Sequence, residues 1–465
     1  MTVLRLNPAE RPEQAALPAR ADAGSEEAEI SWAQRITIIW LAGMFILLPV
    51  EVIKLPLNVS PVDVWTMMAL PVMWMLFLRG KQVISLYYAL PMLLILVGSF
   101  ISTFVAPAPR NSLIVILKEI FVLIWFVTVA AALVGIRARD FHRILVVWSA
   151  VVLLHGLVIV AQFLSPDLWQ FTAEHLGRGE GYEIYRPSGL FPNANSAAFF
   201  QLLGFVPLLL ARPSRITGAV LGLILLTTMA ATGSMGSLLA FTAGAMVALA
   251  ALAVRGRIRV IVTLAVRFAI AAGLLGALLF VLISQNQRYQ THLQKILLGR
   301  AERSSEGRFD LWERGMDVFL DKNVFLWGVG PENFRVVDGN DNQLHNDFLA
   351  FSVERGLIST LGLAMFALLA VIKAIKLFLI TDSRRRDDSE LVVVVLLAAM
   401  VGAFVYSLTH QVFHNRQLWL ILGLQEAMYF MLLNAGNGRE MAGAMLKVAP
   451  GQRVRSLSGS RIAGT

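Results

Sequence analysis

Apolar runs of about twenty residues recur along this chain, and each is long enough to cross a bilayer as a helix. The backbone of a membrane-spanning segment must satisfy its own hydrogen bonds, and these runs lack the period-two alternation of a membrane β-barrel. We therefore expect an all-α, polytopic membrane protein. The sequence predicts about twelve transmembrane helices, at residues 36–53, 60–78, 87–105, 112–134, 143–164, 195–211, 216–232, 235–254, 260–283, 347–379, 391–409 and 417–434.

Basic residues between these spans gather on one side of the expected membrane. With the N-terminus inside, the short loops on the outer side hold only Lys54, Arg110 and Arg416, whereas every inner loop carries several arginines or lysines. Because cytoplasmic loops are enriched in these residues, both termini are predicted to be cytoplasmic. The net charge of +9 follows from this topology. It favours contact with anionic membrane lipid and does not indicate nucleic acid.

The chain divides into a membrane domain and two tails. Residues 1–35 and 435–465 are polar, and we expect them to be disordered cytoplasmic tails around a transmembrane domain at 36–434. Two long loops face outward, at 165–195 and 284–346. The second contains an amphipathic segment around 305–320, which is expected to lie on the membrane surface or to cap the bundle. Long loops in compact proteins are usually functional.

The segment NQLHNDFLAFSVERGL, which leads into the tenth span, combines a histidine with buried charge. His345 is placed where the helix meets water and can exchange protons near neutral pH. If helix runs throughout, His345 shares a small, polar face with Gly356, and Glu354 lies nearly opposite, aligned with Asp347. We therefore expect Glu354 to anchor an arginine or lysine of a neighbouring span. His345 can alternatively be an interfacial cap of the helix.

Other polar residues of the spans have competing interpretations. Lys118 and Glu119 suit a structural or a functional role equally, and His155 is expected to make an interhelical hydrogen bond. His410 and His414 have the i,i+4 spacing of a helical metal site, but without nearby carboxylates we favour interfacial residues.

The first outward loop contains the segment RPSGLFPNANSAA. Asn193 or Asn195 can cap the next span and leave backbone N–H groups free at its start. A helix N-terminus beside Arg186 suits an anion, and the planar guanidinium suits phosphate. Arg186 and Arg308 can alternatively be ordinary loop salt-bridge partners.

Four segments occur in a fixed order, namely RPSGLFPNANSAA, GRFDLW, NVFLWGVGPENF and HNDFLAFSVERGL. Together they resemble the O-antigen ligase and polymerase superfamily of bacterial inner-membrane proteins. The resemblance implies transfer of a glycan from a polyprenyl-pyrophosphate carrier to a saccharide acceptor at the periplasmic face. The acceptor would be lipid A–core or a growing glycan. The reaction would be an inverting transfer without a metal or another cofactor.

The resemblance also implies site residues. His345, Arg308 and Arg186 match the family's histidine and two arginines, and we expect support from Glu354, Asp347, Asn346, Trp312 and Asn195. The chemistry agrees, because arginines stabilise a pyrophosphate leaving group and histidine suits a hydroxyl nucleophile. One departure is Met235, where members often carry an arginine.

Two other classes of function compete with a transferase. Twelve spans also suit a transporter or flippase, although the lack of internal repeats argues against this class. A non-catalytic membrane component of a polysaccharide machine would need neither His345 nor the arginines.

Overall fold

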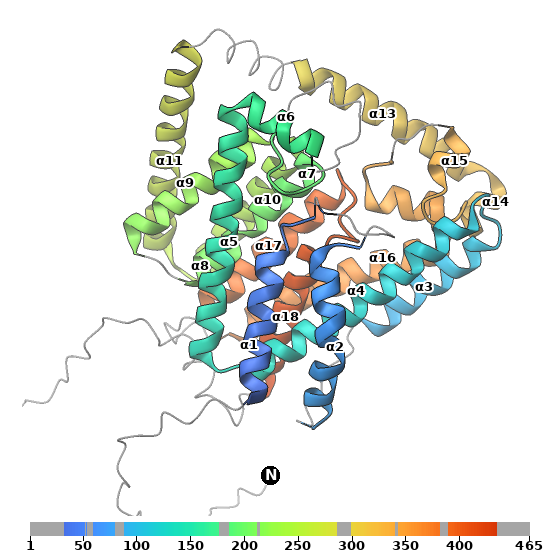
Figure 1. The fold of residues 1–465 in the computed structure, drawn as a ribbon, viewed down its shortest axis with the longest axis horizontal. Helices are drawn as coiled ribbons and strands as arrows, with labels where there is room; N and C mark the ends of the chain where they lie inside the picture. Colours follow the sequence, from blue (N-terminus) through green and yellow to red (C-terminus); the bar gives the residue numbers. More distant parts are fainter. Residues whose placement is uncertain are drawn as a thin grey trace, which may run out of the picture.

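The computed structural model describes residues 32–51, 53, 59–79, 88–175, 186–211, 214–285, 299–339, 343–381 and 389–434. These ranges are mostly helical and contain no β-strand, which confirms the all-α expectation (Figure 1). Both predicted tails lie outside the described residues, except that the first helix already begins at Trp32.

Helices coincide with every predicted span. They are α1 (Trp32–Leu47), α2 (Pro61–Arg79), α3 (Ala89–Thr103), α4 (Pro109–Gly135), α5 (Ala138–Leu164), α7 (Ala194–Leu203) with α8 (Phe205–Ala211), α9 (Arg215–Ala231), α10 (Met235–Val254), α11 (Ile258–Gln285), α16 (Asp347–Ile380), α17 (Ser389–Ser407) and α18 (Arg416–Asn434). Within the described ranges, six segments are both long and apolar enough to cross a membrane, namely those in α4, α5, α7–α8, α10, α16 and α17. The protein is therefore a membrane protein, while twelve crossings remain a prediction.

Among the described residues, the long loops contain four further helices: α6 (Pro166–His175), α13 (Gly299–Leu320), α14 (Lys322–Trp327) and α15 (Phe334–Asp338). The amphipathic helix predicted around 305–320 is confirmed as α13, which starts earlier and lies across one end of the bundle (Figure 1). Its buried side is formed by Leu311 and Gly315, whereas Phe309 and Leu320 of the expected apolar face are exposed. The packed face is therefore rotated from the predicted one.

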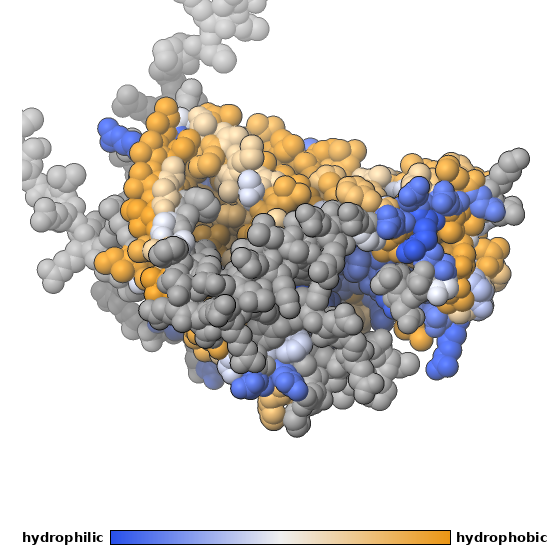
Figure 2. Space-filling view, turned by 90° about the horizontal axis from the view of Figure 1, so that it is seen from above, coloured by the Kyte–Doolittle hydropathy of each residue, from blue (hydrophilic) through white to orange (hydrophobic). Residues whose placement is uncertain are grey.

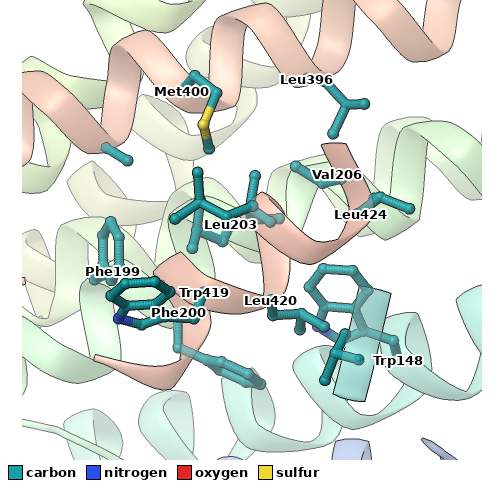
Figure 3. Packing of buried hydrophobic residues seen from close by; sticks show 14 of the residues in the cluster. Trp148, Phe199, Phe200, Leu203, Val206, Leu396, Met400, Trp419, Leu420 and Leu424 are labelled. Atoms are coloured by element: carbon teal, nitrogen blue, oxygen red, sulfur yellow. The ribbon is translucent and has the colours of Figure 1, made fainter. Parts of the chain in front are cut away.

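The core lies where the central helices meet. Figure 3 shows Trp148 of α5, Phe199 and Phe200 of α7 and Trp419 of α18 packed together with leucines of several helices. Large hydrophobic side chains are nonetheless common on the outside as well, and Figure 2 shows apolar residues over much of one face. This distribution is the one expected of a protein whose solvent is lipid.

Helix α16 is interrupted at Gly356, where φ is 68° and ψ is −171°. The segment that follows α14 crosses α16 here, because the backbone N–H of Gly330 donates to the carbonyl of Glu354 at 2.7 Å. A side chain at Gly356 would clash with the backbone of Leu326 and Trp327 at the end of α14, and the positive φ also favours glycine. The uninterrupted helix assumed for the face of His345 and Gly356 is therefore wrong.

Candidate functional site

If the twelve predicted spans alternate in direction, six of the loops between them fall on the predicted outer side. All six contribute residues to one polar end of the molecule. Among them, Arg186 follows α6, Thr232 follows α9, and His345 lies just before α16. His410 and His414 lie in the loop between α17 and α18 rather than on a helix. The candidate site is built where these connections touch.

His345 is held by the residues on either side of it. Asn346 caps α16 by accepting a hydrogen bond from the Leu349 N–H at 3.1 Å, and the indole of Trp312 donates to the carbonyl of Leu344 at 2.8 Å. His345 itself has φ of 49°, a left-handed conformation that few non-glycine residues adopt. These contacts fix the ring at the edge of the bundle.

Asp347 ties the α17–α18 loop to the same point. Its carboxylate accepts hydrogen bonds from the backbone N–H groups of Val412 at 2.9 Å and Phe413 at 3.2 Å. This clamp brings the ring centroid of His410 to 6.2 Å from that of His345. Two histidines that are 65 residues apart in sequence therefore face one another.

Arg308 of α13 lies against this histidine pair. Its guanidinium is 3.3 Å from Nε2 of His410, and His410 stacks on Tyr406 with centroids 4.4 Å apart. Partial burial lowers the pKa of Arg308, although a guanidinium stays charged at neutral pH.

Arg186 approaches from the α6–α7 connection. It donates to the side chain of Asn195 at 2.9 Å and to the carbonyl of Thr232 at 3.1 Å. The hydroxyl of Tyr406 donates to the carbonyl of Asn195 at 2.7 Å, so Arg186 and the His410 stack share one anchor. Of the two predicted caps, Asn193 is the one that caps α7, through the Ser196 N–H.

The electrostatics of His345 show which cations face it. Burial lowers its pKa to about 4, and the positive charges of Arg308, Arg335 and Arg186 act in the same direction. His345 is therefore neutral at pH 7, and it titrates well below the neutral range predicted from the sequence for its proton exchange. We define His345, His410, Arg308, Arg186 and Arg335 as the cationic cluster. Three arginines beside one neutral imidazole suit two ligand groups: an anion bound by the arginines and a hydroxyl group bound by the imidazole.

A second set of polar contacts lies deeper. Arg355 of α16 pairs with Glu119 of α4, both almost fully buried, and Nε2 of His414 lies 3.1 Å from the same carboxylate. The expectation that Glu354 anchors a cation of another span is wrong, since Arg355 makes that interspan pair. The Glu354 carboxylate instead accepts from the backbone N–H of Glu332.

A cavity of about 700 Å³ opens beside the cationic cluster. Its wall includes Lys118, Arg335, Gln343, His414 and Arg416, together with hydroxyls and side-chain amides. His345, Arg308 and Arg186 do not line it. Arg335 is the member of the cluster that also lines the cavity, so the two adjoin at this residue.

The Ser234-Met235-Gly236 turn packs against the cluster at His410. A side chain at Gly236 would clash with Thr409 and the ring of His410, so glycine permits this close approach. The Met235 side chain is 60% exposed and lines no described cavity. Arg335 is a further positive charge that acts on His345, and no sequence motif had pointed to it.

His410 was not predicted as a site residue. The assumed helical spacing with His414 hid it, yet the alternation of spans already put the end of 391–409 on the same side as His345. His155, as expected, makes an interhelical bond, with its Nδ1 2.9 Å from the amide of Gln201. Within the described ranges, no three His, Asp or Glu side chains come together as a metal site.

Comparison with known proteins identifies part of the chain. Residues 220–366 match the family described as O-antigen ligase (Wzy_C), which confirms the superfamily resemblance over about a third of the sequence. No curated protein matches the chain. The matched segment includes Arg308, Arg335 and His345, whereas Arg186, His410 and His414 lie outside it.

Proposed function

From the O-antigen ligase domain at residues 220–366, we propose that this membrane protein transfers a glycan from a polyprenyl-pyrophosphate carrier to a saccharide acceptor. The reaction takes place at the outer face of a bacterial inner membrane, to which the twelve spans present the cationic cluster. The observation that carries the proposal is the grouping of Arg186, Arg308 and Arg335 around a neutral His345.

The arginines bind the pyrophosphate of the donor. Arg308 and Arg186 come from α13 and from the α6–α7 connection, so the leaving group would be held from two sides. Negative charge builds up on the pyrophosphate as its bond to the sugar breaks, and guanidinium groups placed in advance stabilise that charge. A binding site at the end of the bundle also suits a donor whose polyprenyl chain remains in the membrane.

His345 acts on the acceptor. Its neutral ring accepts the proton of the attacking hydroxyl while the acceptor oxygen bonds to the anomeric carbon and the pyrophosphate leaves from the opposite face. Attack opposite the leaving group inverts the anomeric configuration. Asn346, Asp347 and Trp312 hold the backbone on both sides of His345, and Asn195 holds Arg186. These four residues are thus proposed to position the reacting groups rather than to react.

The test is a transfer assay with purified protein in nanodiscs and a radiolabelled lipid-linked oligosaccharide from the host. We expect His345→Ala to reduce transfer by at least about 100-fold, the usual contribution of a general base. The matched control is His142→Ala on the first turns of α5, which should transfer at the wild-type rate. Wild-type transfer by a folded His345→Ala protein would overturn the assignment.

A second arm separates the transferase from the other classes of function. Proteoliposomes loaded with the same donor on one side report its movement across the membrane. Movement without any transfer would identify a flippase, and neither movement nor transfer in any condition would favour a non-catalytic component.

A further inference from the structure

We propose that the cavity beside the cationic cluster is a saccharide-binding subsite in which His414, held by the Glu119 carboxylate, binds a hydroxyl group of the sugar chain. The inference rests on the proposed function, because a sugar bound here is placed for transfer at His345.

The lining suits a polyhydroxylated ligand. Amide and hydroxyl side chains, among them Asn111, Asn193, Asn415 and Ser60, both donate and accept hydrogen bonds, as sugar hydroxyls do. A volume of about 700 Å³ lies in the range of ordinary ligand pockets and exceeds what a single small anion needs.

The charges of the lining argue against a second pyrophosphate site. Arg416 lies 3.2 Å from Glu51 and also binds Asp63, and Arg335 lies 3.7 Å from Glu332. Because carboxylates accompany these cations, the cavity as a whole is less cationic than the cluster around His345. A neutral or weakly charged glycan fits such a surface better than a phosphate anion does.

His414 is oriented toward this role. Its Nε2 lies against the Glu119 carboxylate, which accepts only, so Nε2 carries a hydrogen, and in the neutral ring Nδ1 is then an acceptor. The side chain is 34% exposed and lines the cavity. Within the described ranges, Nδ1 of His414 has no hydrogen-bond donor. A sugar hydroxyl would supply it.

The cavity is close enough to His345 for transfer. Gln343 lines it and lies two residues before His345, a separation of at most about 7 Å along the backbone. Arg335 both lines the cavity and acts on the charge of His345. The wall of the cavity formed by Gln343 and Arg335 therefore adjoins the segment that carries His345, and a glycan that extends past this wall would bring its end toward the imidazole.

The test is photo-crosslinking in the host cell, in a His345→Ala background so that bound glycan is not turned over. A benzophenone amino acid is placed at Asn111 or at Val336, which line the cavity, and at Leu117 as a control. Leu117 lies on the same helix as Asn111, is 65% exposed and does not line the cavity. We expect periodate-sensitive glycan adducts at the two cavity positions and lipid adducts at Leu117.

Mass spectrometry of the adduct identifies the source of the saccharide. A glycan that still carries polyprenyl pyrophosphate is carrier-linked, and one without it is a carrier-free acceptor; both support a saccharide subsite. No glycan at either cavity position, with lipid adducts still formed at Leu117, would overturn the inference. This result does not depend on whether transfer is detected, so it is separate from a failure of the proposed function.

The role of His414 is tested in the same cells. Loss of one hydrogen bond in His414→Ala should lower the glycan adduct at Asn111 about five-fold. His414→Gln, which keeps an acceptor, should retain most of it, and the lipid adduct at Leu117 should not change. Equal glycan yields with His414 intact and with His414→Ala would remove His414 from the subsite.

Discussion

The pKa of His345 gives the sharpest prediction, because two physical causes that respond differently to salt lower it. Burial is the larger cause of the low pKa, and the positive charges of Arg308, Arg335 and Arg186 lower the pKa further. The fall from the ordinary value of 6.5 to about 4 corresponds to roughly 3 kcal/mol, since each pKa unit is about 1.4 kcal/mol. Relative to an unperturbed histidine, the folded protein favours the neutral ring over the charged ring by that amount.

The sign of the effect on stability follows from the direction of the pKa change. Between pH 6.5 and 4 the unfolded chain binds a proton at His345 that the folded protein does not bind. The free energy of unfolding from this residue therefore falls as the pH is lowered through that window, by roughly 3 kcal/mol in all. Above pH 6.5 His345 makes no such contribution.

The measurement is NMR titration of protein carrying ¹³C-labelled histidine. The chain has seven histidines, and the signal lost in His345→Gln assigns the one of interest. We expect a midpoint near pH 4. Raising the salt from about 0.1 to about 1 M shortens the screening length from about 10 to about 3 Å, so the arginine part weakens while the burial part remains. The midpoint should rise without reaching 6.5.

A second titration of His345 is done with a bound anion. Inorganic pyrophosphate among the arginines offsets their charge, so the midpoint should rise when it is added. Arg308→Gln should raise the midpoint in the absence of the anion. A wild-type midpoint at the ordinary value of 6.5, unchanged by salt, pyrophosphate or Arg308→Gln, would refute the reasoning.

Three further predictions concern stability and donor binding. Glu119→Gln and Arg355→Met each break the buried pair, and each should lower the free energy of unfolding by about 3–5 kcal/mol in denaturation measured in detergent. The double variant should lose less than the sum of the two single losses. Gly356→Ala should lower the melting temperature because of its positive φ and the crossing backbone, whereas Gly222→Ala, with open space at its Cβ, should not; equal melting temperatures would refute this. Arg186→Lys should weaken donor binding about ten-fold in a binding assay, since lysine lacks the bidentate fork, and unchanged affinity would exclude a bidentate contact.

Periodicity and local chemistry determine much of the fold by themselves. The apolar runs predicted helices at each expected span, because a run of about twenty apolar residues has few alternatives in lipid. The amphipathic pattern around 305–320 predicted α13, and the asparagines at 193 and 195 predicted a cap of α7, which the structure assigns to Asn193. The order of four short motifs indicated the superfamily that the match at 220–366 confirms.

Tertiary structure decided which residues meet. Sequence patterns describe one helix at a time, so they cannot show that Asp347 draws His410 to His345, or that Arg335 supplies a third positive charge there. Nor do they show that Arg355, rather than Glu354, makes the interspan pair, because the break at Gly356 depends on a segment that crosses from another loop. Contacts between distant segments depend on how whole helices pack, and a local pattern carries no information about that packing.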